Sequence, residues 1–335
     1  MTYIEKAWYQ KGCKLWYLAP LTLLFWCLSA VRRTLFRVGF KRQQRLEVPV
    51  IIVGNISVGG NGKTPLVIFL AQWLRQQGYH PGVLSRGYGG ATKQWPLSVE
   101  KDSDPRVVGD EPVLMRQHLP CPLVVDPIRP RGGQYLIDKH RCDVIICDDG
   151  LQHYALGRDI EIVVMDGQRR MGNGCLLPMG PLREGKWRLQ HSDFIVLNSG
   201  IAQPGEHLML LEPGQLINLK YPQRTCSMAN MHGPVTAVAA IGNPDRFYQL
   251  LQQKGMKLKD CISFADHHQF CADDLPSGPV IMTEKDAVKC RAFAKEDWWY
   301  LPVSAKLTKA FTDTLTQQLA VAVKTKKREK NHGVR

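Results

Sequence analysis

The most informative segment of the chain is a glycine-rich stretch that ends in Lys-Thr. Residues 54–64 read GNISVGGNGKT, after an apolar run at 48–53 and before an amphipathic stretch at 65–77. A strand, a glycine-rich turn and a helix in this order point backbone N–H groups at phosphates, while the lysine reaches the terminal phosphates and the hydroxyl reaches Mg²⁺. The strict motif has glycine where Ser57 stands, and a simple turn remains the alternative. The residues that we expect to bind ATP are Ser57, Val58, Gly59, Gly60, Asn61, Gly62, Lys63 and Thr64, with Thr64 also a ligand of Mg²⁺.

A phosphate-binding loop needs an acidic partner for the metal, normally at the end of a neighbouring apolar strand. The apolar run 143–147 is followed by Asp148, Asp149 and Gly150. Adjacent side chains at a strand end point in different directions, so one carboxylate can serve the metal and the other an attacking hydroxyl. The alternative is that both aspartates only form a turn before the glycine.

Three further polar clusters follow predicted strands. They contain Ser85 and Arg86, Asp110 and Glu111, and Asp126 with two arginines. An arginine there could neutralise charge on a transferred phosphoryl group, although a single arginine is more often a surface ion-pair partner. We keep Arg86 and Asp110 as catalytic candidates.

The N-terminal region contains the uncharged segment 15–31, which is followed by six basic residues between positions 32 and 45. Its length is at the lower limit for a membrane span, and Pro20 predicts a kink. A spanning helix is slightly favoured over an interfacial helix, and a buried core helix is the third alternative. A cleaved signal peptide is excluded by the missing small-residue cleavage site and the basic flank, which places the following domain on the cytoplasmic face of the inner membrane.

The remainder alternates short apolar runs with amphipathic stretches, which predicts an α/β protein: a P-loop NTPase-like, doubly wound parallel sheet and a second, smaller α/β domain. The predicted strands are 48–53, 82–84, 122–125, 143–147, 160–165, 194–197, 235–241, 261–264, 280–282 and 299–303. The predicted ranges are 1–45 for the membrane-associated helix and its flank, 46–200 for the P-loop domain, 201–233 for a connection, 234–323 for the second domain and 324–335 for a solvated basic tail.

The chain has 335 residues and a net charge of +14, which calls for an anionic partner. Nucleic acid, phospholipid headgroups and phosphorylated substrates satisfy that demand equally, but no nucleic-acid-binding motif is present. We expect no obligate protein partner. The ten cysteines are scattered, and the weak pattern Cys261, His267, His268 and Cys271 gives little support for zinc.

Taken together, the motifs resemble the tetraacyldisaccharide 4'-kinases of lipid A synthesis. They are, in order, GNISVGGNGKTP, SRGYGG, GDEP, DDGLQH, GNGCLLPMGPLRE, IGNPDRF, FADHH and MTEKDAVKC, and they extend over nearly the whole chain. The resemblance implies that Lys63 and Thr64 bind ATP and Mg²⁺, that Asp149 is the base, and that His267 orients or polarises Asp149. Asp148 and Glu184 are then the candidate metal ligands, although the division of roles between the two aspartates stays open.

The implied activity is transfer of the γ-phosphate of ATP to the 4'-hydroxyl of the tetraacyldisaccharide 1-phosphate precursor of lipid A, giving lipid IVA. Its partners would be the lipid disaccharide and an anionic membrane surface. The alternative is a membrane-tethered P-loop NTPase that acts as a switch or motor.

Overall fold

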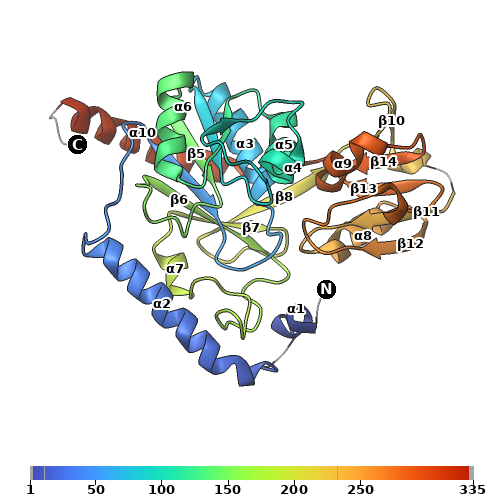
Figure 1. The fold of residues 1–335 in the computed structure, drawn as a ribbon, viewed down its shortest axis with the longest axis horizontal. Helices are drawn as coiled ribbons and strands as arrows, with labels where there is room; N and C mark the ends of the chain where they lie inside the picture. The colour runs from blue at the N-terminus through green and yellow to red at the C-terminus, as the bar shows by residue number, and fades with distance from the viewer. Residues whose placement is uncertain (1–2, 11, 232, 332–335) are drawn as a thin grey trace.

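A computed structural model of the chain describes residues 3–10, 12–231 and 233–331. Its larger part lies on the left in Figure 1. It contains a nine-stranded sheet in the order β15-β8-β7-β6-β1-β5-β2-β4-β3. All neighbours pair in parallel except the edge strands β15 and β3, which confirms the predicted mainly parallel α/β class. The strands are β1 Val50–Gly54, β2 Pro81–Ser85, β3 Leu97–Ser98, β4 Leu123–Val125, β5 Val144–Asp148, β6 Ile160–Asp166, β7 Phe194–Asn198, β8 Glu206–Pro213 and β15 Val303–Leu307.

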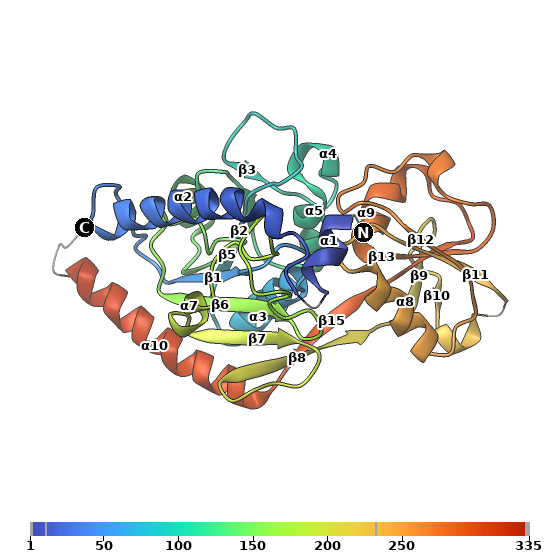
Figure 2. The same cartoon turned by 90° about the horizontal axis from the view of Figure 1, so that it is seen from below.

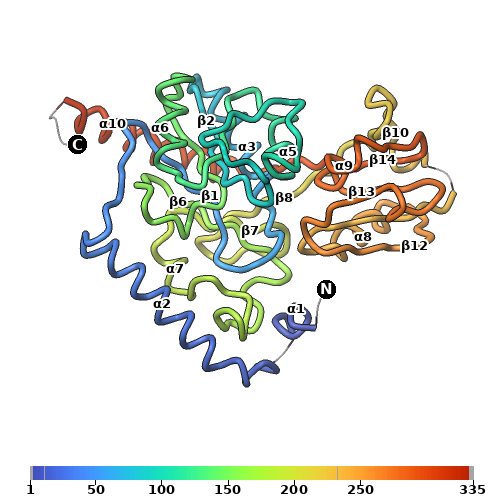
Figure 3. Tube along the Cα trace, in the orientation of Figure 1, coloured from blue at the N-terminus to red at the C-terminus, as the bar shows by residue number. Residues whose placement is uncertain are grey.

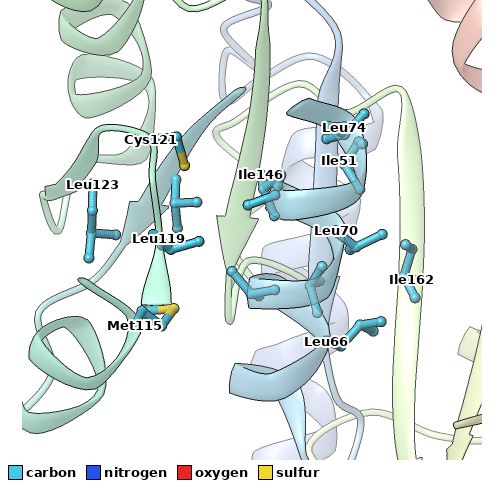
Figure 4. Close-up of a cluster of buried hydrophobic side chains, with 14 of the residues drawn as sticks. Ile51, Leu66, Leu70, Leu74, Met115, Leu119, Cys121, Leu123, Ile146 and Ile162 are labelled. Carbon is cyan, nitrogen blue, oxygen red and sulfur yellow. The ribbon is translucent and has the colours of Figure 1, made fainter. Parts of the chain in front are cut away.

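Helices cover both faces of this sheet, as a doubly wound fold requires. One face packs against α3 (Lys63–Gln76), α5 (Asp110–His118) and α10 (Lys309–Asn331), and Figure 4 shows Leu66, Leu70 and Leu74 of α3 against Ile51 and Ile146 of the strands. The other face packs against α6 (Arg129–His140). The central strands are apolar on both sides because both sides are buried, which explains why they read as continuous apolar runs. The short helices α4 (Pro105–Val108) and α7 (Trp187–Gln190) lie in connections.

A second sheet of six strands lies beside the first, in the order β10-β9-β14-β13-β11-β12. Its core strands β11 to β14 pair in parallel. Helix α8 (Pro244–Gln253) packs on one face and α9 (Glu284–Cys290) on the other. The strands are β9 Leu216–Asn218, β10 Thr225–Cys226, β11 Val235–Ala239, β12 Leu258–Ser263, β13 Val280–Thr283 and β14 Trp298–Leu301, and the 3-10 turns are η1 Trp16–Leu18, η2 Met228–Asn230, η3 Ala272–Asp274 and η4 Arg291–Phe293.

Strand pairing divides the chain differently from the predicted ranges. The chain leaves the large sheet after β8 and returns to it through β15, so it crosses between the sheets twice, as the Cα trace in Figure 3 shows. Strand β8 lies within the predicted connection 201–233, and β15 lies within the range predicted for the second domain. We therefore propose that the second domain comprises residues 216–301 and that 303–331 belong to the P-loop domain.

The N-terminal region forms α1 (Tyr3–Trp8) and α2 (Ala19–Arg37), and α2 runs along the outside of the molecule (Figure 2). Residues 16–37 are the one stretch of the described chain that is long and apolar enough to cross a bilayer, and its most apolar window is entirely unburied. The buried-core alternative is therefore wrong. Pro20 occupies the first turn of α2, where its missing N–H costs nothing, so it begins the helix and the predicted kink is wrong.

The described part of the basic C-terminal segment is helical, because α10 continues to Asn331, and most of its residues are exposed. Lys326 is buried and pairs with Asp159 at 3.2 Å, and Glu329 lies 3.3 Å from Arg45. Residues 332–335 of the predicted tail lie outside the described residues. The end of the chain thus packs beside the basic flank of α2 (Figure 1).

Candidate active site

The glycine-rich loop connects β1 to α3 at the carboxyl edge of the large sheet. Gly62 caps α3 with φ of 91°, a conformation that favours glycine, and no side chain caps the free N–H groups of the first turn. The loop is fixed from outside, because Val58 N donates to Pro181 O at 2.8 Å. Asn61 Nδ2 donates to Ser57 Oγ at 3.0 Å. Uncapped N–H groups at the positive end of a 14-residue helix favour an anion such as a phosphate group.

Asp149 faces this loop from the end of β5. Its carboxylate lies 3.5 Å from Lys63 Nζ and 3.2 Å from Arg183 Nη1. Burial raises the pKa of Asp149, but Lys63 and Arg183 more than offset that effect and lower the pKa to about 2. The backbone of Asp149 is left-handed, with φ of 49°, which turns its side chain toward the two cations. The carboxylate therefore stays ionised throughout the physiological range.

Asp148 has a different environment, since it is only 2% exposed and its carboxylate lacks a cationic partner at ion-pair distance among the described residues. Ser85 Oγ donates to Oδ2 at 3.3 Å, whereas Oδ1 is buried with no hydrogen-bond donor in the described part of the chain. Burial and the nearby charge of Glu111 raise the pKa of Asp148 to about 7. A buried carboxylate oxygen with no partner suits a hard divalent cation, which prefers oxygen ligands.

The structure gives His267 a partner other than the expected one. His267 Nδ1 lies 3.0 Å from both carboxylate oxygens of Asp110, and no contact of the described residues joins His267 to Asp149. The hydrogen bond that His267 Nδ1 donates to Asp110 is the main cause of the raised pKa of His267. Burial raises the pKa of Asp110, but the bond to His267 and the charge of Lys285 lower it to about 2. Asp110 begins α5 of the large domain and His267 follows β12, so this pair spans the two domains.

The environments of two other expected site residues, Arg86 and Glu184, give less support for a role in the site. Arg86 is exposed directly after β2, at the same sheet edge as the loop. Glu184 is buried, and its carboxylate accepts hydrogen bonds from Gln152 and Tyr154 and lies 3.5 Å from Arg188. None of the contacts within the described chain joins Glu184 to Thr64 or Asp148. These partners already occupy both of its oxygens, which leaves Glu184 a weaker metal candidate than Asp148.

Two cations of the site were not singled out from the sequence. Arg183, which binds Asp149, stands in the motif GNGCLLPMGPLRE, and Lys285 stands in MTEKDAVKC. Lys285 lies 2.9 Å from Glu111, 3.0 Å from Asp266 and 3.9 Å from Asp110. Each lay in a motif that the sequence displayed, but only the fold shows which carboxylates they meet.

The first strand of the parallel sheet runs into an uncapped glycine-rich loop, and the adjacent strand ends in the unpartnered carboxylate of Asp148 and the ionised carboxylate of Asp149. These features define a P-loop protein that binds nucleoside triphosphates. Comparison with known proteins narrows the class. The family model described as tetraacyldisaccharide-1-P 4'-kinase, LpxK, matches residues 14–320, and the chain belongs to this family.

Similar proteins agree with that membership. A tetraacyldisaccharide 4'-kinase of Pseudoalteromonas atlantica is 59% identical over 300 residues, which cover 90% of this chain and 98% of the relative. The enzyme of that name from Shewanella frigidimarina is 49% identical over 99% of both chains. A solved structure described as an "apo" form of LpxK from Aquifex aeolicus in complex with ATP superposes with a TM-score of 0.74 at 28% identity, over 90% of this chain and 98% of that one. The chain is thus a kinase of this family, and the predicted family and fold class are confirmed.

Proposed function

We propose that this chain transfers the γ-phosphate of ATP to the 4'-hydroxyl of a tetraacyldisaccharide 1-phosphate, with Mg²⁺, at the cytoplasmic face of the inner membrane. The observation that carries the proposal is that the uncapped loop, Lys63 and the paired aspartates lie together. The family match over residues 14–320 supports it. The matched relatives are named for this kinase activity, which favours it over the alternative of a switch or motor.

The chain's own groups suit a magnesium ion at one position. Thr64 lies in the first turn of α3, and Asp148 supplies the buried oxygen that lacks a donor among the described residues. These two residues would hold the ion, which would supply positive charge against the phosphate oxygens. The raised pKa of Asp148 reflects the cost of a buried carboxylate without a cation at bonding distance.

The geometry favours His267 over Asp149 as the group that accepts the proton from the attacking hydroxyl. A carboxylate with a pKa of about 2 has little affinity for a proton, and Asp149 is already bound to Lys63 and Arg183. His267 has Nδ1 directed at Asp110, which leaves Nε2 as the basic nitrogen. Asp110 stabilises the imidazolium that forms when Nε2 takes the proton, as an orienting carboxylate does in other acid–base pairs. We propose Asp149 as the residue that positions Lys63, and we keep Arg86 as a candidate for charge stabilisation.

The exposed apolar surface of α2 supports membrane association. Leu21, Leu24, Trp26 and Leu28 are exposed, and basic residues follow within the same helix. A substrate with acyl chains leaves a bilayer at a cost of about 0.8 kcal/mol for each CH₂ group, so the enzyme has to reach the substrate at the membrane. Helix α2 and its basic flank would hold the loop edge of the sheet close to the headgroups.

The experiment that tests this function measures ATP turnover with and without the lipid disaccharide in mixed micelles. A kinase converts ATP only when the acceptor is present, in a ratio of one ADP to one phosphorylated lipid. Turnover that is equally fast without the acceptor would favour the NTPase alternative.

A further inference from the structure

One buried amide, Asn198, joins the phosphate-binding loop to the second domain. Asn198 is the last residue of β7 and is 1% exposed. Its Nδ2 donates to the carbonyl oxygen of Asn61 at 3.0 Å, inside the loop. Its Oδ1 accepts from Arg246 Nη2 at 2.6 Å, and Arg246 lies in the first turn of α8 in the second domain. Both ends of a single side chain are therefore used, one on each domain.

The bond to Asn61 fixes the direction of a loop N–H group. The Asn61 carbonyl and the Gly62 N–H belong to one planar trans peptide and point in opposite directions. Holding that carbonyl toward Asn198 directs the Gly62 N–H to the other side of the peptide plane. The contact is close, because a Cβ added to Gly62 would lie 2.3 Å from Asn198 Nδ2. Glycine at 62 thus serves both the left-handed conformation and the approach of this amide.

The other end of the bridge is anchored firmly. Arg246 Nη2 also donates to Ser199 Oγ at 2.6 Å, and Nη1 lies 3.7 Å from Asp166 at the end of β6. Around it the second domain touches the loop directly, since a Cβ added to Gly242 would lie 2.4 Å from the backbone nitrogen of Gly60. Asn243 Nδ2 donates to Asp166 Oδ2 at 3.3 Å. Beside the pairs Asp110–His267 and Glu111–Lys285, one part of the contact between the domains therefore uses the same groups that hold the shape of the loop.

We infer that Asn198 is a positioning residue for ATP phosphate binding, and that Arg246 makes the ATP-binding shape of the loop depend on docking of the second domain. This inference rests on the proposed function, because it concerns the loop that would hold the ATP phosphates. It adds two residues that touch neither the paired aspartates nor His267. Its consequence is that nucleotide affinity and domain docking change together.

The test compares Asn198→Asp, Arg246→Gln and the control Ser199→Ala in the full chain. Asn198→Asp keeps the acceptor for Arg246 but loses the donor to Asn61, so the Kd for ATP should rise about tenfold, the effect of one buried hydrogen bond. Arg246→Gln should raise it about threefold to tenfold. Ser199→Ala removes a second acceptor of Arg246 without touching the loop and should change the Kd less than twofold. The KM for the lipid should stay within about twofold in all three.

A double-mutant cycle of Asn198→Ala and Arg246→Ala separates the bridge from two independent effects. Acting as one unit, the pair should lose less ATP affinity than the product of the single losses. If the double variant loses as much ATP affinity as the product of the two single losses, the inference is overturned. An unchanged Kd for ATP in Arg246→Gln would also overturn it, and this variant can be measured even when a change at buried Asn198 prevents folding. The thermal midpoint without nucleotide, and its increase on adding ATP, distinguish a fold defect from a loop defect. Failure of the wild-type chain to bind ATP would instead contradict the proposed function.

Discussion

The substitution Asp110→Asn tests the pairing that the structure shows and the sequence did not predict. It keeps the shape of the side chain but removes the charge that faces His267 Nδ1 at 3.0 Å. The hydrogen bond that His267 donates to Asp110 is the largest contribution to the raised pKa of His267, whereas burial and Lys285 act in the opposite direction. Without the carboxylate, those opposing effects remain. The pKa of His267 should then fall from its raised value, although the charge of Asp266 still acts to raise it.

A hydrogen bond to a charged group is worth about 1.5–3 kcal/mol, and about 1.4 kcal/mol corresponds to one pKa unit. The pKa of His267 should therefore fall in Asp110→Asn. If neutral His267 takes the proton, the acidic limb of the kcat profile should move to lower pH by the same amount, while the maximal rate falls because the imidazole is less well oriented.

The assay combines the pH dependence of kcat at saturating ATP and lipid with NMR titration of the His267 imidazole. Asp274→Asn is the matched control, because Asp274 binds the neighbouring His268 at 3.1 Å and should leave the profile in place. An acidic limb that stays where it was in Asp110→Asn, together with an unshifted imidazole titration, would refute the assignment of His267 as the base. The same linkage predicts that the stability from this pair is complete between about pH 4 and pH 6.5. It is lost as pH rises through the raised pKa of His267, and also as pH falls through the pKa of Asp110 of about 2.

Three further results are expected. Lys63→Ala should abolish transfer with an unchanged circular dichroism spectrum, because it removes an ammonium that faces Asp149 at 3.5 Å rather than an apolar side chain. Near-normal transfer would remove the loop from the site. Asp148→Asn should raise the Mg²⁺ concentration needed for half-maximal ATP binding. In the wild-type chain, Mg²⁺ affinity should rise with pH through about 7, where Asp148 loses its proton. If added Mg²⁺ rescues Asp149→Asn instead, the roles of the two aspartates are reversed. Deleting residues 1–37 should reduce vesicle binding and lipid turnover more than ATP affinity, and retention on vesicles in high salt would show that another surface is the anchor.

The large sheet could be predicted from the sequence because its central strands are buried on both faces. Runs such as 48–53, 143–147 and 160–165 are mainly apolar, with Asp143 and Glu161 as the acidic exceptions, and each became a strand. Strand β8 was missed because its apolar run, 208–211, is short and is flanked by charged and polar residues, and the strand is only partly buried. Helix α6 begins Arg-Pro-Arg-Gly-Gly, a poor helix-forming start that its packing overrides.

The residues of the site also divide into those that the sequence predicted and those whose contacts only the structure shows. The loop and the paired aspartates are local in sequence, so their types and spacing were enough to find them. The partner of His267 lies 157 residues away, and the bridge through Asn198 joins residues 137 and 48 positions apart. Such contacts depend on how two domains dock, which local patterns do not encode. The motifs indicated that these segments matter but gave no information about which carboxylate faces which base.

The central claim is phosphorylation of a lipid disaccharide by ATP, and mass spectrometry of the lipid tests it most directly. The chain, in detergent or lipid vesicles, is incubated with ATP, Mg²⁺ and tetraacyldisaccharide 1-phosphate, with the Lys63→Ala variant as control. The account predicts one added phosphate on the non-reducing sugar at the 4' position, formed by the wild-type chain and not by the variant. An unmodified lipid in the presence of a folded chain that binds ATP, or a phosphate added at another position, would contradict it.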